Sequence, residues 1–447
     1  MSDYMFMLES HLSPEQNRVL AEVQAAAAEA NVSVFLTGGA MRDVMGGFAV
    51  RDLDFTVEGN ALKLARAVAK KSGAEITFTD ERRKCAELLF PGRVTAEIAM
   101  ARQERYAKPG AQPQVEPATI HEDLRRRDFT INAVALSLNR ASRGLLIDPT
   151  NGLGDLERKE LRAVHNYTLY DEPARILRLV RFRVRLGLTV EERTAQQYEN
   201  VRAEGLERRI MPRRLLEELR EIADDPNPGE ILRALEEEKL LPLFSPALAE
   251  GKLNLAGLAK LHKARQLIPY GAPFQVNNLP LLLSLMAEKL TAREKSELIA
   301  ATGLGAAEVA AWRRLESLAG KLEHELKSPK LHRPFQVYEV LSKAPGEVVL
   351  LLLVRSNLRL VQDRIRNLFQ KYLPAAVEVT DQEVVAKGGQ PGTPKFVKIR
   401  NELIEARLNA RPKRPAPEEG AAAPEAEADE QRPARSPDAR QPKVSRA

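Results

Sequence analysis

Two short runs of this sequence decide its fold: Leu36-Thr37-Gly38-Gly39-Ala40-Met41-Arg42-Asp43 and, a little further on, Arg51-Asp52-Leu53-Asp54-Phe55. Residues 32–36 favour a buried strand that ends at the glycine pair, and residues 40–45 favour a short helix directly after it. Residues 51–57 favour a second strand. Because side chains alternate along a strand, we expect Asp52 and Asp54 on one side of it, with the flanking apolar residues facing the core.

The aspartates and the glycines together predict a site for metal ions and phosphate. Converging carboxylates repel each other, and Mg²⁺ relieves this by taking oxygen ligands from both, which suits a two-metal phosphoryl transfer. Gly38 and Gly39 let the backbone approach a triphosphate, helix-start amides point toward it, and Arg42 neutralises it. Taken singly, a glycine pair is usually a plain turn and Asp-x-Asp a solvated strand end. Their occurrence together, in this order, favours the catalytic interpretation.

Working outward, the amino-terminal part predicts a small mixed-sheet unit. Ser13-Pro14-Glu15-Gln16 has the pattern of a capping box and predicts a helix to about residue 30. Helical spacing over 60–71 and strand patterns over 75–78, 85–90 and 94–100 follow. From residue 123 strands become scarce, and amphipathic patterns run to about 408.

These patterns predict an α+β fold, in which a head with a small mixed sheet and helices is followed by an all-α neck, body and tail. Residues 411–447 are rich in proline, alanine and charge, and bury too little apolar surface to offset their ordering entropy. We divide the chain into an N-terminal helix (1–30), the head (31–160), a neck (161–225), a helical body and tail (226–408) and a disordered tail (409–447).

Composition adds weaker constraints. Lysine and arginine exceed aspartate and glutamate by 68 to 62 over 447 residues, which mildly favours an acidic partner such as nucleic acid, although a solvated basic surface fits equally well. Cys85 is the single cysteine, which excludes an intramolecular disulfide and a cysteine-rich zinc site. No run approaches the roughly 20 apolar residues of a membrane helix, and no export signal begins the chain. We expect a cytoplasmic protein without membrane contact.

Two more charged runs predict phosphate and nucleotide binding: Asp123-Leu124-Arg125-Arg126-Arg127-Asp128-Phe129-Thr130-Ile131-Asn132-Ala133 and Asp171-Glu172-Pro173-Ala174-Arg175-Ile176-Leu177-Arg178-Leu179-Val180-Arg181-Phe182. In the first, the arginines up to Arg127 form a phosphate-binding edge that Asp128 caps or orients. In the second, Arg175, Arg178 and Arg181 share one broad helix face. Either run alone would be a solvated helix end.

Together these runs resemble the signatures of the class II tRNA nucleotidyltransferase and bacterial poly(A) polymerase family, whose head has the polymerase-β-like nucleotidyltransferase fold. The resemblance implies transfer of a nucleoside monophosphate from CTP or ATP to the 3′ end of tRNA or another RNA, with release of pyrophosphate and two Mg²⁺ ions. It implies metal ligands at Asp52 and Asp54, and a further carboxylate at Glu97 in Glu97-Ile98-Ala99-Met100-Ala101-Arg102. It implies that Glu172 and Arg175 read the incoming base. The full nucleotide-binding set is Gly38, Gly39, Arg42, Arg127, Asp128, Glu172, Arg175, Arg178 and Arg181.

The sequence departs from the family at two places. Glu172 stands where the family usually has aspartate, and one extra methylene shifts the carboxylate that selects cytosine or adenine. The family's glycine- and threonine-containing loop is replaced by Asp80-Glu81-Arg82-Arg83-Lys84-Cys85, a region in which enzymes that add only part of the terminal triplet often differ. The sequence therefore leaves open the addition of CCA, of CC, of A or of poly(A). It also leaves open a catalytically silent RNA-binding relative and a small-molecule nucleotidyltransferase.

Overall fold

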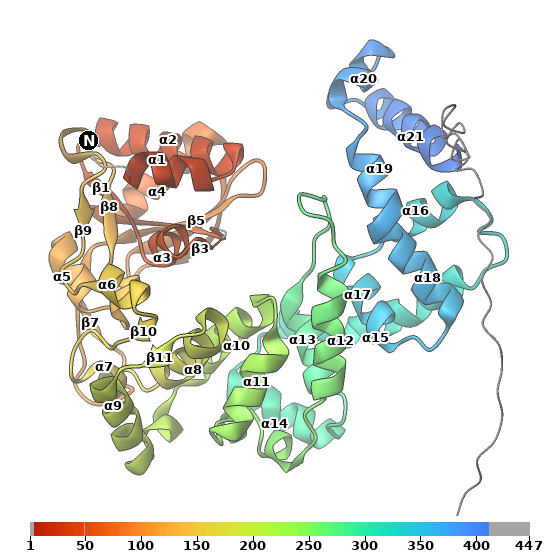
Figure 1. Cartoon of the computed structure of the whole chain (residues 1–447). Helices are drawn as coiled ribbons and strands as arrows, with labels where there is room; N and C mark the ends of the chain where they lie inside the picture. The colour runs from red at the N-terminus through yellow and green to blue at the C-terminus, as the bar shows by residue number, and fades with distance from the viewer. Residues whose placement is uncertain (1–3, 49, 411–447) are drawn as a thin grey trace, which may run out of the picture.

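The computed structural model describes residues 4–48 and 50–410 and has the form of an open arc. Figure 1 shows the sheet and its helices at one end, a helical body in the middle, and helices α20 (Asp381–Ala386) and α21 (Pro394–Asn409) at the other end. The predicted disordered tail lies, from residue 411 on, outside the described residues.

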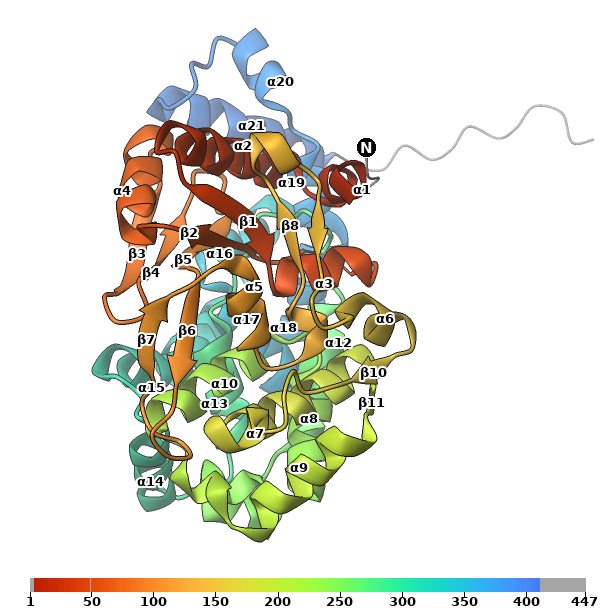
Figure 2. The same cartoon turned by 90° about the vertical axis from the view of Figure 1, so that its left-hand side faces the viewer.

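The head is built on a seven-stranded sheet. In spatial order its strands are β3 (Glu75–Asp80), β4 (Cys85–Leu89), β5 (Thr95–Met100), β2 (Leu53–Glu58), β1 (Ser33–Thr37), β8 (Ala135–Ser137) and β9 (Leu146–Ile147). Strands β2 and β5 pair in parallel, and the other neighbours are antiparallel. The five strands predicted between residues 32 and 100 are confirmed to within a few residues. Strand β8, which lies beside β1 (Figure 2), and strand β9 at the edge of the sheet were not predicted because they are very short.

Helices cover the sheet and provide the core of the head. The predicted helix after Ser13 is α2 (Pro14–Glu29), and Ser13 and Gln16 cap it reciprocally as expected. It packs against α4 (Ala61–Ser72), which lies on β4 and β5. The apolar residues of β2, Leu53, Phe55 and Val57, are fully buried in this core. The other elements of the head are α1 (Tyr4–His11), α3 (Gly39–Met45), α5 (Ile120–Arg125), α6 (Gly152–Glu157) and the unpredicted hairpin of β6 (Arg102–Arg105) and β7 (Gln114–Pro117).

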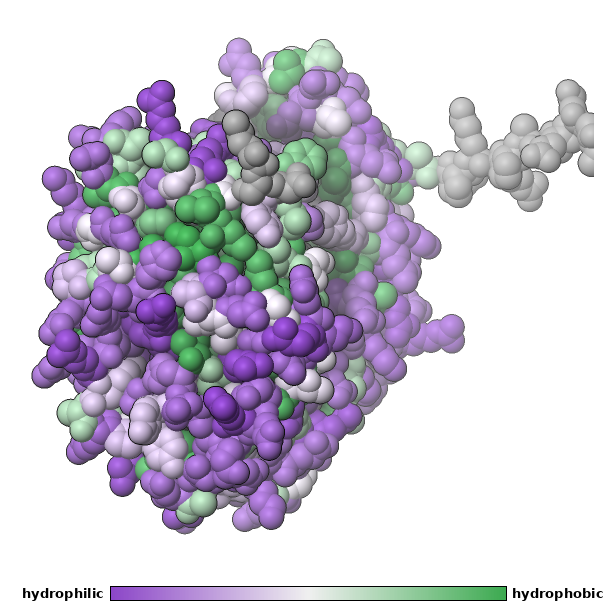
Figure 3. Space-filling view, turned by 60° about the vertical axis from the view of Figure 1, so that its left-hand side comes forward, coloured by the Kyte–Doolittle hydropathy of each residue, from purple (hydrophilic) through white to green (hydrophobic). Residues whose placement is uncertain are grey.

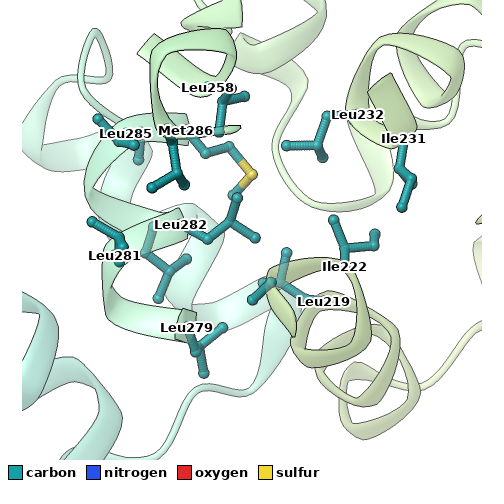
Figure 4. Packing of buried hydrophobic residues seen from close by; sticks show 14 of the residues in the cluster. Leu219, Ile222, Ile231, Leu232, Leu258, Leu279, Leu281, Leu282, Leu285 and Met286 are labelled. Atoms are coloured by element: carbon teal, nitrogen blue, oxygen red, sulfur yellow. The ribbon is translucent and has the colours of Figure 1, made fainter. Parts of the chain in front are cut away.

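Beyond the head the chain is helical, as predicted. The neck contains the short pair β10 (Glu160–Leu161) and β11 (Thr189–Val190), with helices α7 (Thr168–Asp171), α8 (Arg175–Leu186), α9 (Glu192–Ala203) and α10 (Pro212–Asp224). The remaining helices are α11 (Pro228–Glu237), α12 (Leu255–Arg265), α13 (Asn278–Met286), α14 (Ala292–Thr302), α15 (Ala306–Leu326), α16 (Pro334–Lys343), α17 (Gly346–Arg355), α18 (Arg359–Asn367) and α19 (Leu373–Val377). One leucine-rich core joins neck to body, and Figure 4 shows α10, α11, α12 and α13 meeting in it.

The surface of the head side is largely polar. Figure 3 shows hydrophilic residues over most of this face, with a hydrophobic group in its upper half. Among the described residues, no helix combines the length and the apolar character that crossing a bilayer requires.

Candidate nucleotidyl-transfer site

A cleft of about 930 Å³ lies between one face of the head sheet and helices α8 and α10. All of the residues predicted for the site line it, although they come from distant parts of the chain. They are Gly38, Gly39, Arg42, Asp52, Asp54, Glu97, Arg127, Asp128, Glu172, Arg175, Arg178 and Arg181. The structure thus brings the three sequence signatures to one place.

One wall of the cleft carries a row of carboxylates across the sheet. Asp54 on β2 lies opposite Glu97 on β5, and Glu97 lies opposite Glu87 on β4. Asp52 stands just before β2, so the predicted strand begins two residues later than expected, where pairing with β5 begins. Its carboxylate accepts a hydrogen bond from the Thr95 hydroxyl. Glu87 was not predicted, although the alternation of β4 places it on the same face as Glu97.

This crowding changes the acidity of Asp54. Burial, followed by the charges of Glu97 and Asp52, raises the pKa of Asp54 to about 7, against the opposing effects of Arg127 and a hydrogen bond from the Gly39 amide. The pKa of Glu87 is raised as well, first by burial and then by Glu97. The wall therefore concentrates more negative charge than its neighbours neutralise, and it favours a bound cation.

The glycine turn fits closely against this wall. Gly38 has a φ of 66°, and a Cβ atom built on it would lie 3.0 Å from Arg127 Nη1 and 3.1 Å from Asp54 Oδ2. A Cβ on Gly39, the first residue of α3, would lie 3.6 Å from the same Asp54 oxygen. Glycine is required at position 38 both for the backbone angle and for the space.

Arg127 joins the end of α5 to the sheet. Its Nη2 donates hydrogen bonds to the hydroxyls of Thr37 and Thr56, each at 3.1 Å, and to Asp123 at 2.9 Å. Asp123 is fully buried and also accepts from Arg126 at 2.6 Å. Burial alone would raise the pKa of Asp123, but Arg126 and Arg127 outweigh it and lower the pKa. Arg127 therefore lines the cleft as an anchored cation held in a fixed position.

Asp128 orients an arginine of α8. Its Oδ2 accepts a hydrogen bond from Arg178 at 2.8 Å, and its Oδ1 accepts from the Asn132 side chain at 3.0 Å. Arg178 also donates to Glu218 of α10 at 2.8 Å, and Arg181 donates to the other oxygen of Glu218 at 3.2 Å. Burial opposes ionisation of Asp128, but Arg178 and Arg175 hold its pKa well below the usual range. The result is a buried ion-pair network between head, α8 and α10.

The predicted base-reading pair lies at the start of α8. Glu172 Oε2 is 3.5 Å from Arg175 Nε, and Glu172 Oε1 is 2.6 Å from Arg214 Nη2 on α10. Arg175 is buried and donates to the carbonyls of Thr168 and Arg126. Sequence reasoning placed the first two of these residues but missed Arg214, which shares the carboxylate.

The loop that departs from the family, between β3 and β4, contacts α10. Asp80 Oδ2 lies 3.2 Å from Arg213 Nη2, and Arg83 Nη1 lies 4.0 Å from Glu217 Oε1. The missed residues of α10, which include Glu217 and Glu218, share one signal: arginines and glutamates spaced four residues apart on a helix expected next to the signatures.

The comparisons with known proteins agree with this geometry. Residues 34–162 match the family model described as the poly A polymerase head domain. This part of the chain is therefore similar to that head domain. The matched part contains the glycine turn, the carboxylate wall and Arg127.

Similarity extends beyond the head domain. The chain is 31% identical over 363 residues to the A-adding tRNA nucleotidyltransferase of Aquifex aeolicus, covering 80% of this chain and 43% of that protein. It is 34% identical over 227 residues to the CC-adding tRNA nucleotidyltransferase of Deinococcus radiodurans, covering 51% and 59%. It thus spans less than two thirds of these relatives. A solved tRNA-processing enzyme in an apo form shares the fold, with a TM-score of 0.51, 26% identity, and coverage of 89% of this chain and 99% of that one.

Proposed function

We propose that this protein transfers a nucleoside monophosphate from CTP or ATP to the 3′-hydroxyl of a tRNA and releases pyrophosphate. The observation that carries the proposal is the opposition of two surfaces in one cleft. The carboxylates of Asp52, Asp54 and Glu97 form one side, and the arginines of α8 form the other. The relatives named A-adding and CC-adding tRNA nucleotidyltransferases support a tRNA as the acceptor.

Magnesium fits the carboxylate wall as a metal that arrives with its substrate. Among the described residues, no group of three or more histidine, cysteine or acidic side chains is arranged to hold a metal ion by itself. Mg²⁺ is usually bound by one or two carboxylates together with substrate phosphates. The uncompensated charge at Asp54 fits this mode, with Asp52 and Asp54 as the protein ligands and Glu97 close by. Bound magnesium would polarise the 3′-hydroxyl and stabilise the leaving pyrophosphate.

Backbone and side-chain groups of the protein position the nucleotide in the cleft. The glycine turn keeps side chains away from the space beside Asp54, and α3 begins there with the Gly39 amide directed at the Asp54 carboxylate. At the other end, Glu172 offers carboxylate oxygens, and Arg175 keeps an Nε–H without a hydrogen-bond partner among the described residues, while its two terminal nitrogens are held by backbone carbonyls. A base has distinct edges of donors and acceptors, so this pair is suited to select between cytosine and adenine.

A cytoplasmic location belongs to the same proposal. Cys85 is a buried free thiol, as is usual for a cysteine in a reducing compartment.

The test is single-nucleotide resolution of the products. Purified protein is incubated with magnesium and labelled CTP or ATP and with tRNAs that end at the discriminator base, after C or after CC. Addition of CCA, of CC or of A supports the proposal and assigns the number of nucleotides. Long adenylate tails on generic RNA would instead assign a poly(A) polymerase. If the protein binds RNA but extends none of the primers, it is a catalytically silent RNA-binding protein.

The matched control is Asp54→Asn. Under the proposal this variant binds tRNA as the wild type does but incorporates nothing, because it loses a metal ligand without losing volume. Full activity of Asp54→Asn would contradict the metal assignment.

A further inference from the structure

Two of the arginines that line the cleft, Arg51 and Arg185, have no role in the proposed reaction. Arg51 directly precedes Asp52, and Arg185 lies near the end of α8, one turn after Arg181. Both line the cleft. The protein holds them more loosely than it holds Arg42 and Arg178.

Arg185 has no close partner. Its side chain is only 13% exposed, and its nearest acidic atoms are Asp43 Oδ2, 3.6 Å from Nη2, and Asp225 Oδ2, 3.7 Å from Nε. Both distances are too long for hydrogen bonds. Within the described ranges, 4–48 and 50–410, the Arg185 guanidinium donates no hydrogen bond. By contrast, Arg42 donates to Asn132 at 2.8 Å and Arg178 to Glu218 at 2.8 Å.

Each of the two acidic residues beside Arg185 has one carboxylate oxygen engaged by another group. Asp43 Oδ1 lies 2.7 Å from Arg42 Nη2, and Asp225 Oδ1 accepts a hydrogen bond from the Asn227 amide at 2.9 Å. Asp225 Oδ2 has no hydrogen-bond partner among the described residues. Because a buried donor without an acceptor costs free energy, this arrangement is suited to a ligand that brings oxygens.

Arg51 stands across from Arg185 at the same carboxylate. Its Nη2 lies 3.8 Å from Asp225 Oδ2, its Nη1 donates to the Asp224 carbonyl at 3.2 Å, and its side chain is 31% exposed. Burial, followed by the like charges of Arg51 and Arg42, lowers the pKa of Arg185 to about 10. Arg51, Arg42 and Arg185 thus lie close together at this end of α8, with Asp43, Asp225 and Glu221 as their acidic neighbours.

We infer that Arg51 and Arg185 form a phosphate seat for the substrate, at the end of α8 remote from the Glu172–Arg175 pair. The inference rests on the proposed function. Ten residues of helix separate Arg175 from Arg185, a rise of about 15 Å. A base read at the start of α8 thus leaves the seat for a phosphate group further along the substrate. The planar guanidinium forks suit bidentate contact with phosphate oxygens.

Two parts of the substrates carry this chemistry: the backbone of the acceptor RNA and the polyphosphate of the incoming nucleotide. The experiment measures kcat and KM separately for RNA and for nucleotide in Arg51→Gln and Arg185→Gln. Arg18→Gln is the matched control, because Arg18 is 74% exposed on α2 and its one ion pair among the described residues is with Glu22. We expect a roughly tenfold or larger rise in KM for one substrate, with a smaller change in kcat.

The substrate whose KM rises is the one whose phosphate binds to Arg51 and Arg185. A higher KM for RNA, with the salt dependence of RNA binding reduced by roughly 0.7 per lost contact, assigns the RNA backbone. A higher KM for CTP or ATP, with weaker inhibition by pyrophosphate, assigns the polyphosphate. If both KM values stay within twofold of the wild type in both variants, the inference is wrong.

A purely structural role is tested with Asp225→Asn. If Arg185 only neutralises Asp225, removing both charges in Arg185→Gln/Asp225→Asn restores KM together with the melting temperature, and the phosphate seat is refuted. If the seat is real, KM stays raised in the double variant. Should the wild type extend no RNA, the proposed function fails, and direct titration of the same variants with ATP and with tRNA still tests the seat.

Discussion

The carboxylate wall makes a quantitative prediction for metal-free protein. In the folded chain the pKa of Asp54 is raised from its ordinary value of 3.8 to about 7, first by burial and then by Glu97 and Asp52. In the unfolded chain the Asp54 carboxyl loses its proton near pH 3.8. Between these values the folded state binds more protons than the unfolded state, so the free energy of unfolding falls as pH rises through this range. The loss is absent below about pH 4 and complete above about pH 7.

The size of the effect follows from the same two values. A pKa rise from 3.8 to about 7 corresponds to about 4 kcal/mol at high pH. Asp54→Asn carries no proton at this position and escapes the loss. Relative to the wild type, it should therefore gain about 2.5 kcal/mol of stability between pH 5 and pH 8.

The assay is urea unfolding of both proteins in EDTA at pH 5 and pH 8, followed by fluorescence and circular dichroism. Glu29→Gln, at an exposed position of α2, controls for the removal of one carboxylate. Magnesium should stabilise the wild type at pH 8 more than it stabilises Asp54→Asn, because the metal relieves the repulsion. A stability difference between variant and wild type that is the same at both pH values would refute the reasoning.

Three further predictions concern the cleft. Gly38→Ala should lower activity strongly, because the added Cβ would meet the side chains of Asp54 and Arg127. Gly47→Ala is the control: Gly47 has a similar φ of +71° and no described atom within 4 Å of an added Cβ, so the variant should lose only about 1–2 kcal/mol of stability through backbone strain. Equal effects of the two variants in thermal melts and incorporation assays would count against the close fit at Gly38. Glu218→Ala should lower the free energy of unfolding by about 3 kcal/mol, because Arg178 and Arg181 lose the carboxylate that they share. Glu218→Gln should lower it by less. Melting temperatures equal to that of the wild type in both variants would contradict this prediction. Glu172→Asp should change the ratio of CTP to ATP incorporation, measured in competition on one tRNA primer; an unchanged ratio would remove Glu172 from base selection.

The sequence predicts the chemical half of the site well. A buried strand, a glycine pair and a second strand with alternating aspartates are local patterns, and each constrains its own backbone. Strands β1 and β2 and helix α3 therefore lie close to their expected positions, and Glu97 pairs with Asp54 in neighbouring strands. Short strands such as β8 were missed because three residues are too few to show a period.

The partners of the arginines could not be predicted in the same way. Arg178 and Glu218 are 40 residues apart, and no pattern in either segment indicates that the two side chains pair. The charge pattern of α8 predicted one basic face, but in the structure the arginines on this face have different partners. Arg178 and Arg181 share a buried carboxylate, Arg175 is held by backbone carbonyls, and Arg185 is held loosely.

This division affects how the cleft recognises its substrates. An arginine whose donors are already bound to protein offers a fixed positive charge but few free N–H groups, so it stabilises phosphate mainly through its field. A loosely held arginine can supply directed hydrogen bonds as well, and each of these depends on the geometry of the ligand. Loss of Arg178 should therefore act through the position of Asp128 and the joint between head and neck, whereas loss of Arg185 should act through substrate affinity. Of the four arginines on this face of α8, Arg185 therefore has the most N–H groups available to a ligand.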